Sequence, residues 1–272
     1  LSRVLLDKEY KPDYNIGFPA KRITTQLEWE DMVLDYQVAT ELEEINVWIS
    51  SGKTVMEDWG LSRILKAGYR SLFYGPPGTG KTLAATLLGK KNEMDVYRID
   101  LSMIVSKYIG ETEKNLAKVF DLAENRNWIL FFDEADALFG KRTSTNTSND
   151  RHANQEVAYL LQRIEDFPGM VILATNLRSN IDEAFFRRFQ SVVYFPMPTE
   201  EQRAELWRNM LPGKWLGKDA EELITMAAET ELSGGAITNV VRRCALRMIQ
   251  SKKKLLDKVM LKEALQKEKI KS

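Results

Sequence analysis

The chain has 272 residues, which is enough to bury a sizeable core in one or two domains. Lys and Arg number 39, as do Asp and Glu, so no global charge attracts the chain to nucleic acid or membrane. The single cysteine, Cys244, excludes an internal disulfide and suits a reducing compartment. Neither a long apolar run nor a signal-peptide pattern is present, which predicts a soluble, cytoplasmic protein without membrane insertion.

The first part of the chain carries little periodic signal. Residues 1–28 are polar with scattered aromatic side chains, so we interpret them as an N-terminal arm or linker. Residues 41–49 have a helical pattern, and residues 52–60 are expected to form a connecting segment. We therefore place the start of the first globular domain at residue 29.

Strand-like and helix-like segments then alternate. Apolar segments of four to six residues predict strands, and amphipathic segments predict helices, at residues 71–74 (strand), 83–90 (helix), 96–101 (strand), 112–125 (helix), 128–132, 170–174 and 191–195 (strands). Continuous apolar strands are typical of parallel sheets covered on both faces. Residues 29–197 are thus expected to form an α/β domain with helices on both faces of a mainly parallel sheet.

The strands stop after the pair Pro196 and Pro198. Thr199 with Gln202, and Asp219 with Glu222, have the spacing of capping boxes that begin helices. Two further helical patterns cover about residues 237–248 and 257–268. We expect residues 198–272 to form a small all-α domain. Its last part is basic, with eleven Lys or Arg against three Asp or Glu from residue 242 onward. This favours a solvated helix face but leaves contact with an acidic partner or a phosphate backbone open.

A glycine-rich segment lies between the first predicted strand and the helix that follows it. Residues 75–82 read Gly-Pro-Pro-Gly-Thr-Gly-Lys-Thr, which fits the phosphate-binding pattern Gly-x-x-x-x-Gly-Lys-Ser/Thr. Glycines let main-chain N–H groups approach phosphates, and the following helix adds the positive end of its dipole. Lys81 would reach the β- and γ-phosphates, and the Thr82 hydroxyl could bind Mg²⁺.

Two adjacent carboxylates end the strand at residues 128–132. Asp133 is expected to help hold Mg²⁺, and Glu134 to activate the attacking water as a general base. Asp136 could belong to the same site, but capping of a helix explains its position equally well. With the glycine-rich segment, these residues predict binding of a nucleoside triphosphate with Mg²⁺ and its hydrolysis.

Three other features are ambiguous on their own. Asn176 follows a strand and could orient water, although asparagine is also a common turn residue. Arg187 and Arg188 could form surface salt bridges or serve as arginine fingers. Tyr108, in a glycine-ended loop with Lys107 and Ile109, could be a core aromatic or an exposed functional one.

Taken together, six segments in order resemble the AAA+ ATPases, and within them the AAA clade that includes katanin, spastin and the ESCRT disassembly ATPase. The segments are residues 75–82, 106–113, 131–136, 174–176, 181–189 and 232–236, and the resemblance extends over residues 29–251. The lead-in at residues 29–34 and the region of residues 59–60 are similar to bacterial stand-alone AAA ATPases, some of them encoded with contractile injection systems. The implied fold is a P-loop NTPase domain followed by a helical lid domain.

The resemblance assigns roles to residues. It makes Asn176 the sensor 1 residue and Arg187 and Arg188 arginine fingers that serve a neighbouring subunit, which implies a homo-oligomer, usually a hexamer. It places Lys107, Tyr108 and Ile109 in a pore loop that grips a polypeptide. The implied ATP-binding residues are Asp31, Met32, Val33, Gly75, Pro76, Pro77, Gly78, Thr79, Gly80, Lys81, Thr82, Leu83, Gly234 and Gly235, with Thr82 and Asp133 at Mg²⁺.

Two departures from the family pattern limit this interpretation. The Leu-Asp-Gly-Phe subunit-signalling motif reads Ile-Glu-Asp-Phe at residues 164–167, and the Gly-Ala-Asp of the lid reads Gly-Gly-Ala at residues 234–236. No arginine occupies a sensor 2 position in residues 232–236, which fits the AAA clade. We expect a ring ATPase that remodels, unfolds or disassembles a protein substrate. The alternatives are an ATP-gated scaffold that threads nothing and a nucleic-acid-associated AAA+ protein. The pore-loop aromatic and the missing arginine argue against the nucleic-acid alternative.

Overall fold

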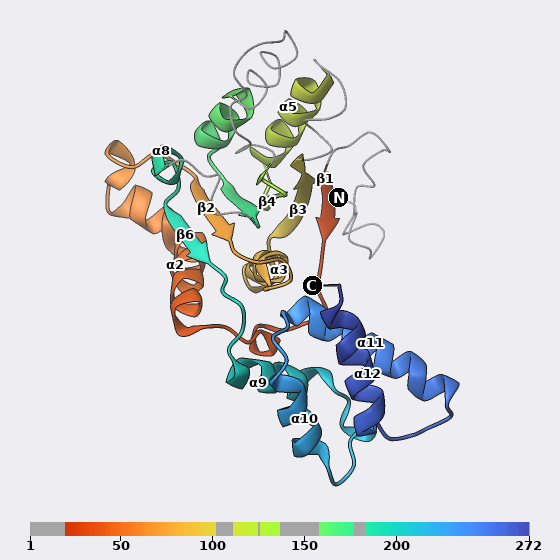
Figure 1. The fold of residues 1–272 in the computed structure, drawn as a ribbon. Coiled ribbons are helices and arrows are strands. Elements are labelled where there is room, and N and C mark those ends of the chain that lie inside the picture. The colour runs from red at the N-terminus through yellow and green to blue at the C-terminus, as the bar shows by residue number, and fades with distance from the viewer. Residues whose placement is uncertain (1–19, 102–110, 125, 137–157, 177–182, 272) are drawn as a thin grey trace, which may run out of the picture.

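The computed structural model describes residues 20–101, 111–124, 126–136, 158–176 and 183–271 (Figure 1). A six-stranded sheet with the order β1-β3-β4-β5-β2-β6 lies at its centre. Its neighbouring strands are parallel except for β1, which is antiparallel to β3. The strands are β1 (Ala20–Ile23), β2 (Tyr69–Tyr74), β3 (Asp95–Asp100), β4 (Trp128–Asp133), β5 (Met170–Thr175) and β6 (Ser191–Tyr194).

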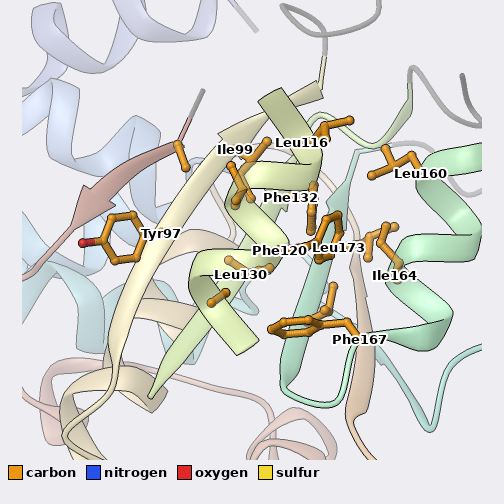
Figure 2. Packing of buried hydrophobic residues seen from close by; sticks show 14 of the residues in the cluster. Tyr97, Ile99, Leu116, Phe120, Leu130, Phe132, Leu160, Ile164, Phe167 and Leu173 are labelled. Carbon is orange, nitrogen blue, oxygen red and sulfur yellow. The ribbon is translucent and has the colours of Figure 1, made fainter. Parts of the chain in front are cut away.

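One face of the sheet is covered by α5 (Glu111–Glu124) and by the helical residues 158–166 (Figure 2). Successive side chains of a strand point to opposite faces, so every second residue of the apolar strands belongs to this layer. The layer is dense in aromatic rings: Phe120 stacks on Phe132 with centroids 5.9 Å apart and meets Phe167 edge-on at 5.5 Å. Strand residues in this cluster include Leu72, Ile99, Leu130, Phe132, Val171 and Leu173.

The opposite face is covered by α2 (Tyr36–Lys53) and α3 (Lys81–Lys91) (Figure 1). Alternate residues of the same strands form this second cluster with Leu42, Ile45 and Leu88 of the two helices. The strands β2, β4 and β5 are therefore buried on both faces, as their continuous apolar sequences predict. The α/β fold class predicted from the sequence is confirmed.

Two segments differ from the sequence-based expectation. Residues 20–23, placed in an arm or linker, form β1, and its register pairs Lys21 with Arg98 and Ile23 with Val96. A four-residue strand at the edge of a sheet carries too little periodicity to be found from sequence. The helix expected at residues 41–49 is α2, which begins at Tyr36, where the Asp35 carboxylate accepts a hydrogen bond from the Gln37 amide. It continues into a π-helical turn, Thr54–Asp58, in the expected connecting segment.

After β6 the chain enters a second, all-helical core, as predicted. The helices are α9 (Glu200–Met210), α10 (Ala220–Ala228), α11 (Gly234–Gln250) and α12 (Lys258–Lys269). The Thr199–Gln202 capping box is present, whereas Asp219 precedes α10 without a side-chain cap. Cys244 is fully buried in this core, where burial raises the pKa of its thiol to about 11. In the described part of the chain, no helix is long and apolar enough to span a membrane.

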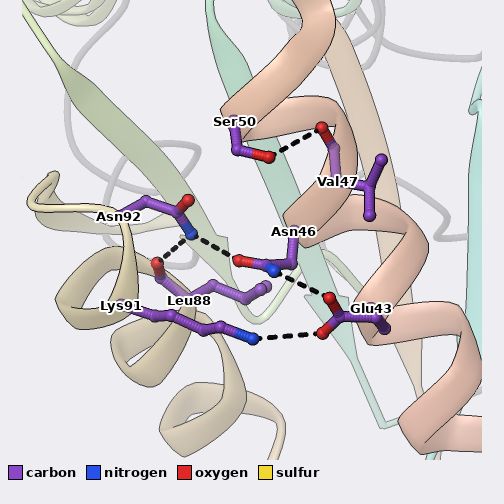
Figure 3. Close-up of polar contacts among 7 residues, drawn as sticks. All are labelled: Glu43, Asn46, Val47, Ser50, Leu88, Lys91 and Asn92. Atoms are coloured by element: carbon purple, nitrogen blue, oxygen red, sulfur yellow. Dashed lines mark hydrogen bonds and ion pairs between the residues drawn. The ribbon is translucent and has the colours of Figure 1, made fainter.

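A polar network fastens α2 to the end of α3 (Figure 3). The Asn46 side chain, which is 8% exposed, donates to Glu43 Oε1 at 3.0 Å and accepts from Asn92 Nδ2 at 2.9 Å. Asn92 also donates to the Leu88 carbonyl at 2.8 Å, and the Lys91 ammonium lies 3.1 Å from Glu43 Oε2. The network therefore fixes the position of the helix that begins at Lys81.

We expect Asn46→Ala to destabilise the protein by about 1–2 kcal/mol, because it leaves the half-buried Asn92 amide with one partner fewer. Chemical denaturation with the midpoint and slope fitted separately is the measurement. Ser50→Ala is the matched control on the same helix: its hydroxyl donates to the Val47 carbonyl on an exposed face, so its effect should stay within about 0.5 kcal/mol. Equal effects of the two substitutions would contradict a stabilising role for the network.

Candidate active site

The glycine-rich segment connects β2 to α3 in a backbone shape that depends on glycine. Gly75, Gly78 and Gly80 have φ of 139°, 75° and 106°, values that side-chain-bearing residues rarely adopt. A Cβ on Gly75 would lie 2.2 Å from the Phe195 carbonyl oxygen. The segment can thus pass close to β6 and turn directly into the N-terminus of α3, where main-chain N–H groups favour an anion.

Lys81 is the buried cation of this segment. It is 7% exposed, and its ammonium donates to the Gly75 and Pro76 carbonyls at 2.7 and 2.8 Å. Burial lowers the pKa of Lys81 to about 8, although Asp133 and Asp136 act in the opposite direction. An ammonium held by neutral carbonyls would be stabilised by phosphate charge, which fits the predicted role.

Asp133 and Glu134 stand at the end of β4, beside the glycine-rich segment. Asp133 Oδ1 accepts from the Glu134 amide at 3.0 Å, and Asp133 Oδ2 lies 2.8 Å from Arg98 Nη2. Glu134 is exposed and has φ of 55°, a left-handed conformation that costs a non-glycine residue about 1 kcal/mol or more. The Ala135 amide donates to the Ala174 carbonyl on β5, which holds this turn against the sheet.

Asn176 and Asp136 complete this edge of the sheet. Asn176 directly follows β5 and is exposed. Asp136 Oδ1 accepts a hydrogen bond from the Thr175 hydroxyl, so its carboxylate links the end of β4 to the end of β5. The structure therefore gives Asp136 a contact that bridges two strand ends.

The helical domain closes over the glycine-rich segment. The Gly235 amide donates to the Gly78 carbonyl at 3.0 Å, and a Cβ on Gly78 would lie 2.5 Å from Ser233 Oγ. Ser233 caps α11 by accepting from the Ala236 amide. Gly234 and Gly235, placed near the nucleotide by resemblance, thus begin a helix that touches the phosphate-binding segment.

These parts line one cavity of about 480 Å³. It brings together nearly all of the predicted nucleotide-site residues: Asp31, Met32, Val33, Pro77, Gly78, Thr79, Gly80, Lys81, Thr82, Leu83, Asp133, Glu134, Asn176, Gly234 and Gly235. Gly75 and Pro76 lie behind the lining and hold Lys81. Sequence reasoning did not assign four other lining residues to the site: Gln202, Leu206 and Met210 of α9 and Thr238 of α11. The spacing of the three α9 residues indicates one face of a helix but gives no sign of a ligand.

The remaining predicted residues are placed differently. Arg187 and Arg188 are exposed, follow α8 (Glu183–Phe186) and are not part of the cavity lining. Arg188 Nη1 lies 2.5 Å from Glu165 Oε1, and its guanidinium packs over the Phe185 ring. Lys107, Tyr108 and Ile109 lie outside the described residues. Both arginines are therefore separate from their own chain's cavity.

The donor set of the cavity fits a triphosphate with Mg²⁺. Lys81 and the α3 N-terminus would meet phosphates, whereas the Thr82 hydroxyl and Asp133 offer the oxygen ligands that Mg²⁺ prefers. No group of three or more His, Cys, Asp or Glu suited to a metal occurs among the described residues. Mg²⁺ bound beside phosphates needs only one or two protein ligands, so this agrees with the predicted arrangement.

The fold and the cavity define a nucleotide-binding domain of the P-loop class. Residues 71–197 match the family described as ATPase family associated with various cellular activities, or AAA. The chain therefore contains an ATPase domain of the AAA family. The AAA domain of FIGL-1, solved in complex with ADP, superimposes with a TM-score of 0.71 at 22% identity, covering 91% of this chain and 86% of that one.

Curated relatives are similar over part of their length. Cell division protein C of Sulfolobus acidocaldarius is 42% identical over 50% of this chain and 38% of its own. Vacuolar protein sorting-associated protein 4B of Mus musculus is 34% identical over 66% of this chain and 42% of its own. A proteasome-activating nucleotidase of Methanocella arvoryzae is 31% identical over 68% of this chain and 46% of its own. The chain thus spans less than half the length of these relatives.

We expect Gly78→Ala to weaken nucleotide binding about tenfold or more, roughly 1.4 kcal/mol, because the added methyl group would push Ser233 and α11 away from the loop. Titration with a fluorescent ADP analogue is the measurement. Gly213→Ala is the control, since a Cβ there meets nothing within 4 Å. An unchanged affinity of the Gly78 variant would show that the contact between loop and helix is dispensable.

Nucleotide affinity should also depend on the charge of Lys81. Its pKa of about 8 in the free protein must rise when phosphate binds, because phosphate stabilises the ammonium. Affinity should then be constant below pH 8 and fall above it, by at most about tenfold per pH unit. The test is the affinity for ADP measured from pH 7 to 10, with Lys81→Gln as a control that should show a flat profile. A flat profile in the unaltered protein would contradict the assignment.

Proposed function

We propose that this chain is a Mg²⁺-dependent ATPase that works as an oligomeric ring to remodel a protein substrate. The observation that supports it best is the single cavity that combines Lys81, Asp133, Glu134 and Asn176 with the helical domain. We assign the sheet domain, residues 29–197, to binding and hydrolysis, and residues 198–272 to a lid that senses the nucleotide.

Each residue has a proposed task in hydrolysis of the β–γ phosphoanhydride bond. Lys81 neutralises charge on the β- and γ-phosphates, and Asn176 orients the attacking water. Glu134 accepts a proton from that water. Mg²⁺, held by Thr82 and Asp133, would neutralise the charge that develops on the phosphate oxygens.

We assign Arg187 and Arg188 to the site of a neighbouring subunit. They lie outside their own cavity and are exposed, so a second chain is the simplest source of a phosphate for them. Charge stabilisation by such a finger is worth about 10³–10⁵ in rate in related phosphoryl transfers. A homo-oligomer with shared sites follows, and the family resemblance favours a hexamer.

We propose a polypeptide as the substrate, gripped by Lys107, Tyr108 and Ile109. The family resemblance supports this, together with relatives whose names refer to protein sorting and to proteasome activation. The alternatives stated from sequence stay open: an ATP-gated scaffold, or a protein associated with nucleic acid. Of these, the basic residues from Arg242 onward favour only the second.

The decisive experiment is ATP hydrolysis measured across a range of protein concentrations. Specific activity should rise with concentration, and Glu134→Gln and Arg188→Ala should each reduce it by at least about 10³-fold. A mixture of the two inactive variants should regain activity, because the Glu134→Gln subunit still offers Arg188 to the intact Glu134 of its neighbour. Failure of the mixture to recover activity would overturn the shared site.

Matched variants separate the rival functions. Arg187→Ala tests whether one arginine or both act as fingers. Tyr108→Ala should abolish handling of a protein substrate and leave ATP turnover within about twofold, since the family resemblance assigns this side chain to a loop that grips the substrate. A substitution at Tyr108 without effect on the substrate would favour the scaffold. Hydrolysis stimulated by DNA in a salt-dependent manner would favour the nucleic-acid-associated alternative.

A further inference from the structure

A charged side chain on β3 contacts the carboxylate that is assigned to Mg²⁺. Arg98 Nη2 lies 2.8 Å from Asp133 Oδ2. The strand register pairs Arg98 with Phe131 and Asp100 with Asp133. Because residues two apart in a strand share a face, Arg98 and Asp133 project to the same side of the sheet, the one covered by α3.

The carboxylate of Asp133 is held at both oxygens. Oδ1 accepts from the Glu134 amide at 3.0 Å, and Oδ2 is paired with Arg98. The Asp133 side chain is 19% exposed, so the ion pair is only partly screened by water. A carboxylate fixed in this way has little rotational freedom left to lose when a metal ion arrives.

Arg98 does not line the cavity, so it acts on the site through Asp133 and not through direct contact with the nucleotide. We propose that Arg98 is a positioning residue that preorganises Asp133 for Mg²⁺ and so increases the gain in nucleotide affinity that Mg²⁺ provides. This inference rests on the proposed function. Groups that orient metal ligands through such contacts typically change metal affinity about 10- to 100-fold when they are removed.

A purely structural role is the competing explanation, because an arginine between β3 and β4 could simply join the two strands. The chain offers a matched control for it. Arg22 on β1 forms a similar ion pair with Asp95 on β3, with Nη2 and Oδ1 2.5 Å apart, and neither residue lines the cavity. Arg22→Met therefore removes an ion pair between neighbouring strands of the same sheet and leaves Asp133 untouched.

The test is the affinity for a fluorescent ADP analogue, measured with saturating Mg²⁺ and with EDTA; the ratio of the two reports the metal's contribution. Arg98→Met keeps the apolar stem and should lower that ratio about tenfold. Its affinity in EDTA should stay within about twofold, because nucleotide contacts are retained. Arg98→Lys should restore most of the ratio, and Arg22→Met should leave it unchanged. Electron paramagnetic resonance of Mn²⁺ bound with ADP should show the same order of metal affinities.

Each other outcome overturns the inference. An unchanged ratio in Arg98→Met would leave only a structural role, and a higher ratio would make Arg98 a competitor of the metal ion. Arg98→Gln provides a second neutral variant if Arg98→Met unfolds, as judged by thermal melting. If the unaltered protein binds the analogue equally well with Mg²⁺ and with EDTA, the proposed metal-dependent function itself fails, which is a different result from a defect confined to Arg98.

Discussion

The in-register parallel pairing of β2, β5 and β4 is the constraint on which the site depends. Tyr74 pairs with Thr175, and Leu173 pairs in turn with Phe132, so all three strands end at the same edge of the sheet. The glycine-rich segment and Asn176 follow the ends of β2 and β5, and the acidic pair stands at the end of β4. Because helices cover both faces of these strands, polar groups from all three can meet water or a ligand at this carboxyl edge.

The two domains have separate cores, and the cavity lies where they meet. Among the residues that the structure describes, the lid core, which contains the fully buried Trp207, shares no buried residues with the two clusters that cover the sheet. Buried Arg203 joins the linker to the lid by donating to the Pro198 and Ala228 carbonyls. The Gly235 amide and the Gly78 carbonyl, in contrast, join the lid to the glycine-rich segment through one hydrogen bond. A nucleotide that fills the cavity can therefore bias the orientation of the lid without disturbing either core.

Local chemistry was readable from the sequence, whereas contacts between distant segments were not. The glycine-rich segment and the strand ending in Asp133 and Glu134 are continuous motifs whose shape follows from residue type, and periodicity identified the sheet and the lid. In contrast, β1 owes its strand to pairing with β3 along its whole length. The ion pair between Arg98 and Asp133 joins residues 35 positions apart, so no local pattern encodes it. The start of α2 at Tyr36 was missed even though it is encoded locally, because Asp35 is a recognisable N-cap.

The charges around the cavity make the site responsive to its ligand. Lys81 is buried among neutral carbonyls with a pKa of about 8, so the protein holds a cation that is costly to keep charged without a phosphate. Asp133 is a carboxylate fixed beside Arg98. Phosphate would offset the cost of keeping Lys81 charged, and a metal ion would find the carboxylate of Asp133 already in place as a ligand. Because Lys81 begins α3 and Asp133 ends β4, both adjustments would act on elements of the sheet domain, which contacts the helical domain at Gly78.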